Sequence, residues 1–228
     1  LYLHFTMQDN PSLKPEVIKR YESLYSGVFY ERFVKGRWVA VFGAVYPFMD
    51  NERMYCDIPS DIESWAVSCD YGTVNPAPFG LWYRVDEYYF NSRTQGFQKT
   101  DEEHYDGLEK LIDGRKIECV IVDPSAASFI EVIRRHGKYT VVSAENNVIN
   151  GIRQTSQALK GRKIRICKNC RAARREFSLY RWDGSGRSDA PVKENDHAMD
   201  DIRYFVATKI YGCDGFFAVA TKRQEETA

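Results

Sequence analysis

Two aspartates stand at the ends of apolar runs that are typical of buried strands. Asp70 follows "SWAVSC" at residues 64–69, and Asp123 follows "IECVIV" at residues 117–122. A carboxylate beside an apolar strand is costly to remove from water unless a charge outside the strand compensates it. Ligands of open α/β sheets bind at the carboxyl ends of the strands. We therefore expect both aspartates to face a ligand at one edge of a sheet.

A third acidic group lies in "ENDHAMDDIRYF" at residues 194–205. On a helix that begins near residue 195, Asp196 and Asp200 are four residues apart and share one face of the first turn with His197. Asp201 is a further acid of the same helix. A single aspartate in such a place is commonly a turn or a helix cap. Acids in the order strand, strand, helix are harder to explain as caps and indicate a shared site.

The chemistry expected of such a site is metal-dependent hydrolysis. Gathered carboxylates repel one another and raise each other's pKa unless a cation is present. Mg²⁺ and Mn²⁺ prefer clusters of oxygen ligands without thiolates. Two such ions about 3.5–4 Å apart can activate a water and stabilise the leaving oxygen of a phosphodiester. The acids therefore predict hydrolysis of nucleic acid.

The elements that position these residues are read from hydrophobic periodicity. An amphipathic helix is predicted at 11–27, and a domain boundary near residue 60. An antiparallel hairpin that leads into βαβ units favours an α/β fold, a mixed sheet with helices on both faces. The predicted strands are 65–71, 79–90, 94–99, 117–123, 139–143 and 163–167, and the later helices are 126–136, 147–160, 169–181 and 196–211.

Composition describes an ordinary globular chain. Its 228 residues, 43% of them apolar, are enough to bury a full core. The 32 basic and 32 acidic residues balance, so nucleic acid must be bound by a local patch. Six scattered cysteines favour reduced thiols in a cytosolic chain. No apolar run reaches the roughly 18 residues of a membrane span, so we expect no membrane partner. The sequence begins without Met, and we expect it to be a fragment.

One stretch concentrates basic charge. "KGRKIRICKNCRAARR" at 160–175 holds eight basic residues and no acid. A solvated surface is the simpler interpretation, but beside a phosphodiesterase site such residues would hold backbone phosphates irrespective of sequence. The single C-x-x-C within it lacks the second pair that structural zinc needs, so we expect ordinary thiols. The candidate DNA-binding residues are Lys160, Arg162, Lys163, Arg171, Arg174, Arg175 and, in the adjoining loop, Arg187.

Three segments resemble a known family. "DYGTVNPAPFGLWYR", "VIVDPSAASFIEVIRRHG" and "DHAMDDIRYFV" are similar to the nuclease domain of the large terminase subunit of tailed bacteriophages, of the type found in Bacillus phages and defective prophages. The resemblance runs from Trp65 to Tyr211. Residues 1–50 resemble the end of the ATPase domain and the linker of the same protein. The resemblance thus implies a linker segment at 1–60 and a nuclease domain at 61–228.

The resemblance also implies a fold and a set of roles. The fold would be RNase H-like, and the activity a two-metal endonuclease that cuts concatemeric double-stranded viral DNA in the cytoplasm of the infected host. Matched to the family motifs, Asp70, Asp123 and Asp200 correspond to the metal ligands, with Asp196 as a neighbouring ligand, and His197 would orient a water or a ligand. In the full-length protein the partners would be the terminase small subunit and the capsid portal.

Other functions remain open at this point. "DYGT" also resembles the first phosphate motif of actin-like ATPases and sugar kinases, although 228 residues leave no room for their second lobe. Resolvases and transposases would use the same acids, and a catalytically silent binding module is a third possibility. No G-x-x-x-x-G-K-[ST] motif occurs, so we expect this fragment to cut DNA without hydrolysing ATP.

Overall fold

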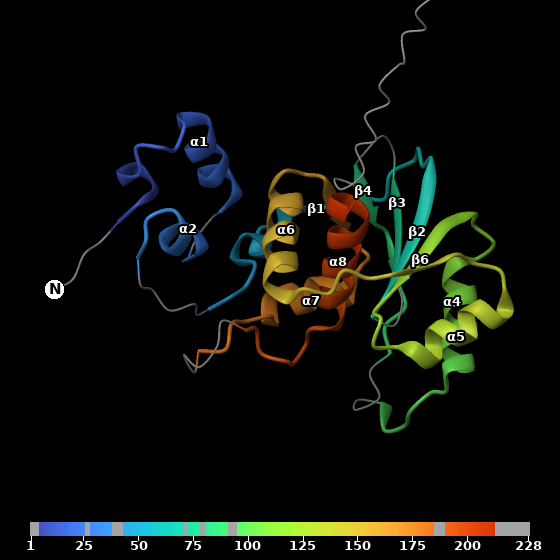
Figure 1. Cartoon of the computed structure of the whole chain (residues 1–228). Coiled ribbons are helices and arrows are strands. Elements are labelled where there is room, and N and C mark those ends of the chain that lie inside the picture. Colours follow the sequence, from blue (N-terminus) through green and yellow to red (C-terminus); the bar gives the residue numbers. More distant parts are fainter. Residues whose placement is uncertain are drawn as a thin grey trace, which may run out of the picture.

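A computed structural model describes residues 5–25, 28–37, 43–70, 73–77, 81–90, 95–184 and 190–212. Two short helices, α1 (Pro15–Leu24) and α2 (Val28–Phe33), precede the sheet and lie away from it (Figure 1). The predicted first helix is confirmed but starts later, at Pro15, because proline in the first turn has a preset φ and needs no N–H partner.

The central element is a five-stranded mixed sheet with the order β5-β3-β2-β6-β7. Strand β3 runs antiparallel to β2 and β5, whereas β2, β6 and β7 are parallel neighbours. The predicted mixed sheet is therefore confirmed. Its strands are β2 (Ser64–Cys69), β3 (Thr73–Ala77), β5 (Asp86–Glu87), β6 (Ile117–Val122) and β7 (Val141–Ser143).

Helices cover both faces of this sheet, as the apolar runs of β2 and β6 predict. Val67 and Val120 are fully buried on one face, against α4 (Asp101–Ile112) and α5 (Ala127–His136). Ala66 and Ile121 are fully buried on the other face, in the core that α6 (Val148–Lys160) completes. Figure 1 shows α4 and α5 on one side of β2 and β6, and α6 on the other. Strands covered on both faces are apolar at nearly every position.

A second, three-stranded parallel sheet joins distant parts of the chain. Its order is β1-β8-β4, with β1 (Tyr55–Cys56), β8 (Ile164–Cys167) and β4 (Trp82–Arg84). Tyr46 and Met49, which precede β1, are buried in the same core. Residues 45–56 thus pack against the later part of the chain, and the division at about residue 60 stays a prediction.

The helices that follow β8 are also confirmed. They are α7 (Arg171–Leu179) and α8 (His197–Phe205), and α8 continues into a π-helical turn, η4 (Val206–Tyr211). Between α7 and α8, Trp182 and Pro191 form an antiparallel bridge. Met199, Ile202 and Val206 are buried, and every residue from 201 to 207 is buried, so this part of α8 and η4 is enclosed on all sides.

Several predicted elements differ from the structure. Helix α4 was not predicted, although Thr100 and Glu103 form a capping box at its start, which is visible in the sequence as T-x-x-E. Residues 95–99, predicted as part of a strand, form none. Strand β3 was not predicted because it contains Pro76, which usually interrupts a strand. The predicted strand 79–90 is divided into β4 and β5, which belong to different sheets, and residues 78–80 lie outside the described part.

Two further findings bear on composition. The five cysteines of the described residues are free thiols, and Cys213 lies outside that part of the chain. Among the helices of the described ranges, none combines the length and the apolar character required to cross a bilayer.

Candidate active site

Asp70 and Asp123 leave the main sheet at the same edge. Strands β2 and β6 are parallel, and Cys69 lies opposite Val122 in their register. The residue that follows each strand is therefore one of the two aspartates. Helix α8 packs against both β2 and β6 and carries Asp200 and His197 in its first turn. The structure thus places Asp70 and Asp123 at one edge of the sheet, and His197 and Asp200 on the helix that packs against the two strands.

Asp70 is paired with the histidine. Nδ1 of His197 lies 3.0 Å from Oδ2 of Asp70. This hydrogen bond raises the pKa of His197, against the opposite effect of burial, and the negative charge of Asp70 adds to the rise. The pair favours a protonated imidazole. Because Nδ1 is directed at Asp70, Nε2 is the ring nitrogen left to contact a ligand.

Asp123 is held by hydrogen bonds on both oxygens. The backbone N–H of Ser125 donates to Oδ1 at 2.8 Å, and the hydroxyl of Tyr204, on α8, donates to Oδ2. Burial would raise the pKa of Asp123, but the hydrogen bonds from Tyr204 and Ser125 outweigh it and lower the pKa. Asp123 is therefore held as a carboxylate of fixed orientation.

Asp200 lies in a different electrostatic environment. Its Oδ1 accepts hydrogen bonds from Nη2 and Nε of Arg203, at 2.9 and 3.2 Å. Burial raises the pKa of Asp200 and outweighs the lowering by Arg203, and the negative charges of Asp70 and Asp196 raise it further. The repulsion predicted for gathered carboxylates is thus present at this site.

Asp196 and Asp201, the two other acids of this region, differ in their surroundings. Asp196 is the N-cap residue of α8, partly buried, but its side chain makes no capping hydrogen bond. Asp201 is only 1% exposed and pairs with Arg84, which is equally buried. Asp201 therefore faces the core, and Asp196 and Asp200 are the helix acids available to a ligand.

The side chains at this edge offer the type of ligand atom that a divalent cation prefers. These atoms are carboxylate oxygens. Burial is the main cause of the raised pKa of Asp200, and the charges of Asp70 and Asp196 add to it, so a bound cation would favour the ionised form. Within the described residues, however, no three acidic, histidine or cysteine side chains are grouped closely enough to hold an ion. Side chains of α8 instead hold the acids singly: His197 holds Asp70, Tyr204 holds Asp123, and Arg203 holds Asp200.

Three residues near the site were not considered in the sequence reasoning: Arg203, Tyr204 and Glu176. Tyr204 and Arg203 lie within the quoted motif, one turn after Asp200, where a helix places neighbours. Glu176, on α7, is fully buried and accepts a hydrogen bond from the backbone N–H of Ala198 at 2.7 Å. No local pattern marks Glu176, because its partners are distant in sequence.

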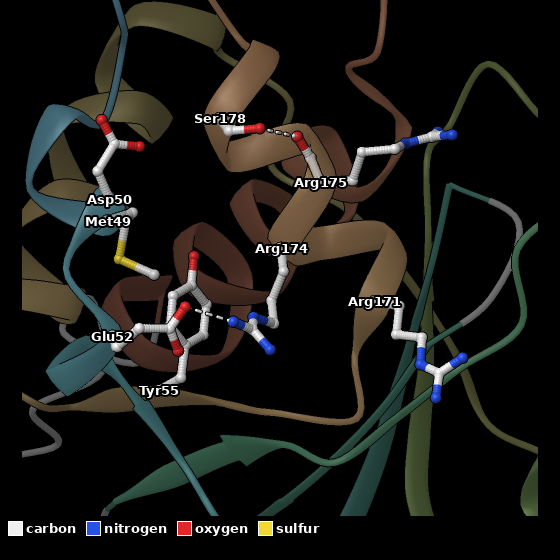
Figure 2. A pocket seen from close by; sticks show the side chains of 8 residues that line it. All are labelled: Met49, Asp50, Glu52, Tyr55, Arg171, Arg174, Arg175 and Ser178. Carbon is white, nitrogen blue, oxygen red and sulfur yellow. Dashed lines mark hydrogen bonds and ion pairs between the residues drawn. The ribbon is translucent and has the colours of Figure 1, made fainter.

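The basic stretch is divided in space. Arg171, Arg174 and Arg175 lie on α7 and line a pocket of about 400 Å³, together with Met49, Asp50, Glu52, Tyr55 and Ser178. Figure 2 shows Arg174 pointing toward Glu52, with which it forms an ion pair at 2.6 Å. The side chains of Arg171 and Arg175 extend away from Glu52 in the same view. Nη2 of Arg175 donates to the hydroxyl of Tyr89 at 3.1 Å, and the Tyr89 ring lies edge-on to His197.

The first part of the stretch lies elsewhere. Lys160 lies over the ring of Phe48, and Lys163 lies over the ring of Tyr211, the last residue of η4. His197 begins α8 and Tyr211 ends its continuation, so Lys163 is at the opposite end of this helix from the histidine. Arg162 follows α6 in a left-handed conformation, and Arg187 lies outside the described residues.

Comparison with known proteins gives a consistent family of relatives. The chain is similar to the large terminase of a thermophilic bacteriophage, solved in complex with ADP, with a TM-score of 0.82 and 41% identity over 93% of this chain and 56% of that chain. It is also 24% identical over 128 residues, 54% of its length, to the large terminase subunit of Escherichia phage T5. No protein-family model matches.

A third similarity concerns the fold. The P22 large terminase nuclease domain matches 72% of this chain and 90% of its own length, with a TM-score of 0.55 and 15% identity. At this identity the likeness is one of fold alone, and it confirms the predicted RNase H-like architecture. The chain spans 56% of the thermophilic phage terminase and 29% of the T5 subunit, so it corresponds to part of such a protein.

Proposed function

We propose that residues 61–228 form a divalent-metal-dependent DNA endonuclease domain. The premise is that this chain is homologous to the large terminase subunits of phages. Its substrate would be concatemeric double-stranded DNA in the cytoplasm of an infected bacterium, and residues 1–60 would be the end of the ATPase domain and the linker. The observation that carries the proposal is the sheet edge at which Asp70 and Asp123 leave adjacent parallel strands beside the helix of Asp200.

The proposed ligands of one or two Mg²⁺ or Mn²⁺ ions are Asp70, Asp123 and Asp200, with Asp196 as a neighbour. When bound, such ions lower the pKa of a water and stabilise the leaving oxygen of a phosphodiester. Tyr204 fixes the orientation of the Asp123 carboxylate. His197, whose Nδ1 is directed at Asp70, offers Nε2 to orient a water or a phosphate oxygen.

The experiment that tests this function is cleavage of supercoiled plasmid by the purified chain. Nicked and linear products should form with Mn²⁺ or Mg²⁺ and should disappear when EDTA is added, because the proposed mechanism needs a divalent ion to activate the water and to stabilise the leaving oxygen. Addition of excess Mn²⁺ after EDTA should restore cleavage. Cleavage at the full rate in EDTA would contradict a metal-dependent mechanism.

We propose that the arginines of α7 hold the DNA backbone next to this site. Arg175 supports this most directly, since its partner Tyr89 contacts His197. Arg171 is exposed on the same helix and also extends away from Glu52 (Figure 2). Arg174 would contribute less while it is paired with Glu52. Lys160, Arg162, Lys163 and Arg187 would extend the contact only for a longer duplex.

Arg175→Gln should weaken duplex binding and reduce its salt dependence. Each phosphate contact releases counterions, so the slope of log affinity against log salt should fall by about 0.9 for one lost contact. The measurement is fluorescence anisotropy of a labelled duplex in Ca²⁺ over a salt series. Lys110→Gln, an exposed change on α4, is the matched control and should leave the slope unchanged. An unaltered slope in Arg175→Gln would remove this arginine from the DNA contact.

The remaining parts of the proposal concern the longer protein. The terminase small subunit and the capsid portal would be partners of the full-length chain. Without a G-x-x-x-x-G-K-[ST] motif, the 228 residues would not themselves hydrolyse ATP.

A further inference from the structure

Glu176 is a charged residue enclosed between α7 and α8. Its side chain is 0% exposed. Oε2 accepts the backbone N–H of Ala198 and Oε1 accepts the hydroxyl of Tyr89, both at 2.7 Å. Burial raises the pKa of Glu176 despite two cationic side chains, Arg175, which is 3.9 Å away and half exposed, and His197. Burial of a carboxylate that the nearby cations do not offset is unfavourable, so packing alone does not account for a glutamate here.

The contact with Ala198 gives α8 a hydrogen-bond acceptor for an N–H group of its first turn. The first N–H groups of a helix have no acceptor within the helix, and a side chain at the N-cap usually provides one. The N-cap residue of α8, Asp196, makes no such hydrogen bond. Glu176 provides the acceptor from the neighbouring helix, at the residue that directly follows His197.

The surroundings of Glu176 connect this contact to the candidate site. Tyr89 donates to Glu176 and lies edge-on to the ring of His197, with the ring centroids 6.2 Å apart. His197 in turn contacts Asp70, and Asp200 follows one turn later on α8. A change in the first turn of α8 would therefore move two of the proposed functional side chains together.

We propose that Glu176 is a positioning residue, which fixes the first turn of α8 and thereby aims His197 and Asp200 at the phosphodiester site. This inference rests on the proposed nuclease function. Its physical requirement is a hydrogen-bond acceptor at position 176, since either protonation state of the carboxyl leaves an oxygen that can accept the Ala198 N–H. Glutamine meets this requirement, whereas methionine fills a similar volume with only a weak acceptor.

The test compares Glu176→Gln with Glu176→Met, and uses Glu109→Met, a carboxylate of α4, as the matched control. Three quantities are measured: kcat and KM for Mn²⁺-dependent plasmid cleavage, duplex affinity in Ca²⁺, and amide hydrogen exchange of the peptide 196–205. Glu176→Met should lower kcat by about 10–100-fold, the usual effect of losing a residue that supports metal ligands. Its KM and duplex affinity should stay within about twofold of the parent, and exchange at 196–200 should become faster while β6 stays protected.

Glu176→Gln should keep the kcat and the exchange protection of the parent, and so should Glu109→Met. Parental kcat in a folded Glu176→Met, or equal losses in Glu176→Gln and Glu176→Met, would overturn the proposal. If Glu176→Met does not fold, the proposal is tested by Glu176→Gln alone. A lower kcat or faster hydrogen exchange in Glu176→Gln would then contradict it. If the parent chain itself cuts no DNA, the nuclease proposal fails, whereas hydrogen exchange still shows whether Glu176 holds α8.

Discussion

Asp70→Asn should reduce metal-dependent plasmid cleavage by more than about 100-fold, beyond the range expected for losing a residue that only supports a metal ligand. The reason is that Asp70 is proposed to bind the metal directly at the edge it shares with Asp123. Asparagine keeps the shape of the side chain and an oxygen that can accept from His197, but it removes the negative charge. The measurement is the initial rate of plasmid nicking in Mn²⁺ and in Mg²⁺, with far-UV circular dichroism as the check on folding.

The matched control for this change is Asp57→Asn. Asp57 is 86% exposed and pairs with Lys168 at the surface, where an ion pair contributes little. Its replacement should leave both cleavage and folding unchanged. If Asp70→Asn folded and cut DNA as fast as the parent, the activity would have to be attributed to a contaminant. The chain would then be a binding module without catalytic activity.

Asp201→Asn should have the largest effect on stability, a loss of about 3–5 kcal/mol in the free energy of unfolding. Asp201 and Arg84 are both about 1% exposed and form an ion pair in the core. Removal of the Asp201 charge takes away the closer of two carboxylates at the buried Arg84 guanidinium, and the other, Glu87, is 3.5 Å away. The measurement is urea-induced unfolding followed by tryptophan fluorescence at constant pH and protein concentration.

Asp200→Asn, the change at the adjacent residue, should have a large effect on cleavage and a small effect on stability. The folded-state pKa of Asp200 is raised above the ordinary value of 3.8, so the ionised form destabilises the fold. That cost sets in as the pH rises from the unfolded-state pKa through the raised one. A neutral asparagine removes that cost, but it also removes the carboxylate charge that pairs with Arg203, whose side chain is only 2% exposed. The two effects oppose each other, so we expect a small net change in stability at pH 7 together with loss of cleavage. Equal stability of Asp201→Asn and the parent would show that the buried pair is not required.

The strands and helices that carry the site follow from local patterns. β2 and β6 are apolar at nearly every position because both of their faces are covered, and α5 to α8 show clear helical spacing. The carboxylates at the strand ends stand out because two apolar runs end in the same way and a helix adds a third acid, although each aspartate alone could be a turn or a cap. These features are encoded within a few residues and could be predicted.

Other features depend on contacts between distant parts of the chain. Neighbouring helix residues such as Asp200 and Asp201 differ in direction by about 100°, but which of them faces the core is decided by Arg84, on another element. The hydrogen bonds of Glu176 likewise join three separate segments. The basic residues 160–175 are contiguous in sequence but separated in space. Lys163, before β8, lies at the Tyr211 end of η4, whereas Arg175, after β8, contacts Tyr89 near the start of α8. No local pattern contains this information.

The most direct test of the account is a crystal of this chain soaked in Mn²⁺ and examined by anomalous diffraction. We predict that two Mn²⁺ ions would be held by Asp70, Asp123 and Asp200, and that Arg203 would shift away from Asp200. The same soak of Asp70→Asn should show neither ion at full occupancy. Anomalous peaks that lie only at surface carboxylates, with the hydrogen bonds of Asp70, Asp123 and Asp200 unchanged, would contradict a metal-dependent nuclease site at this edge of the sheet.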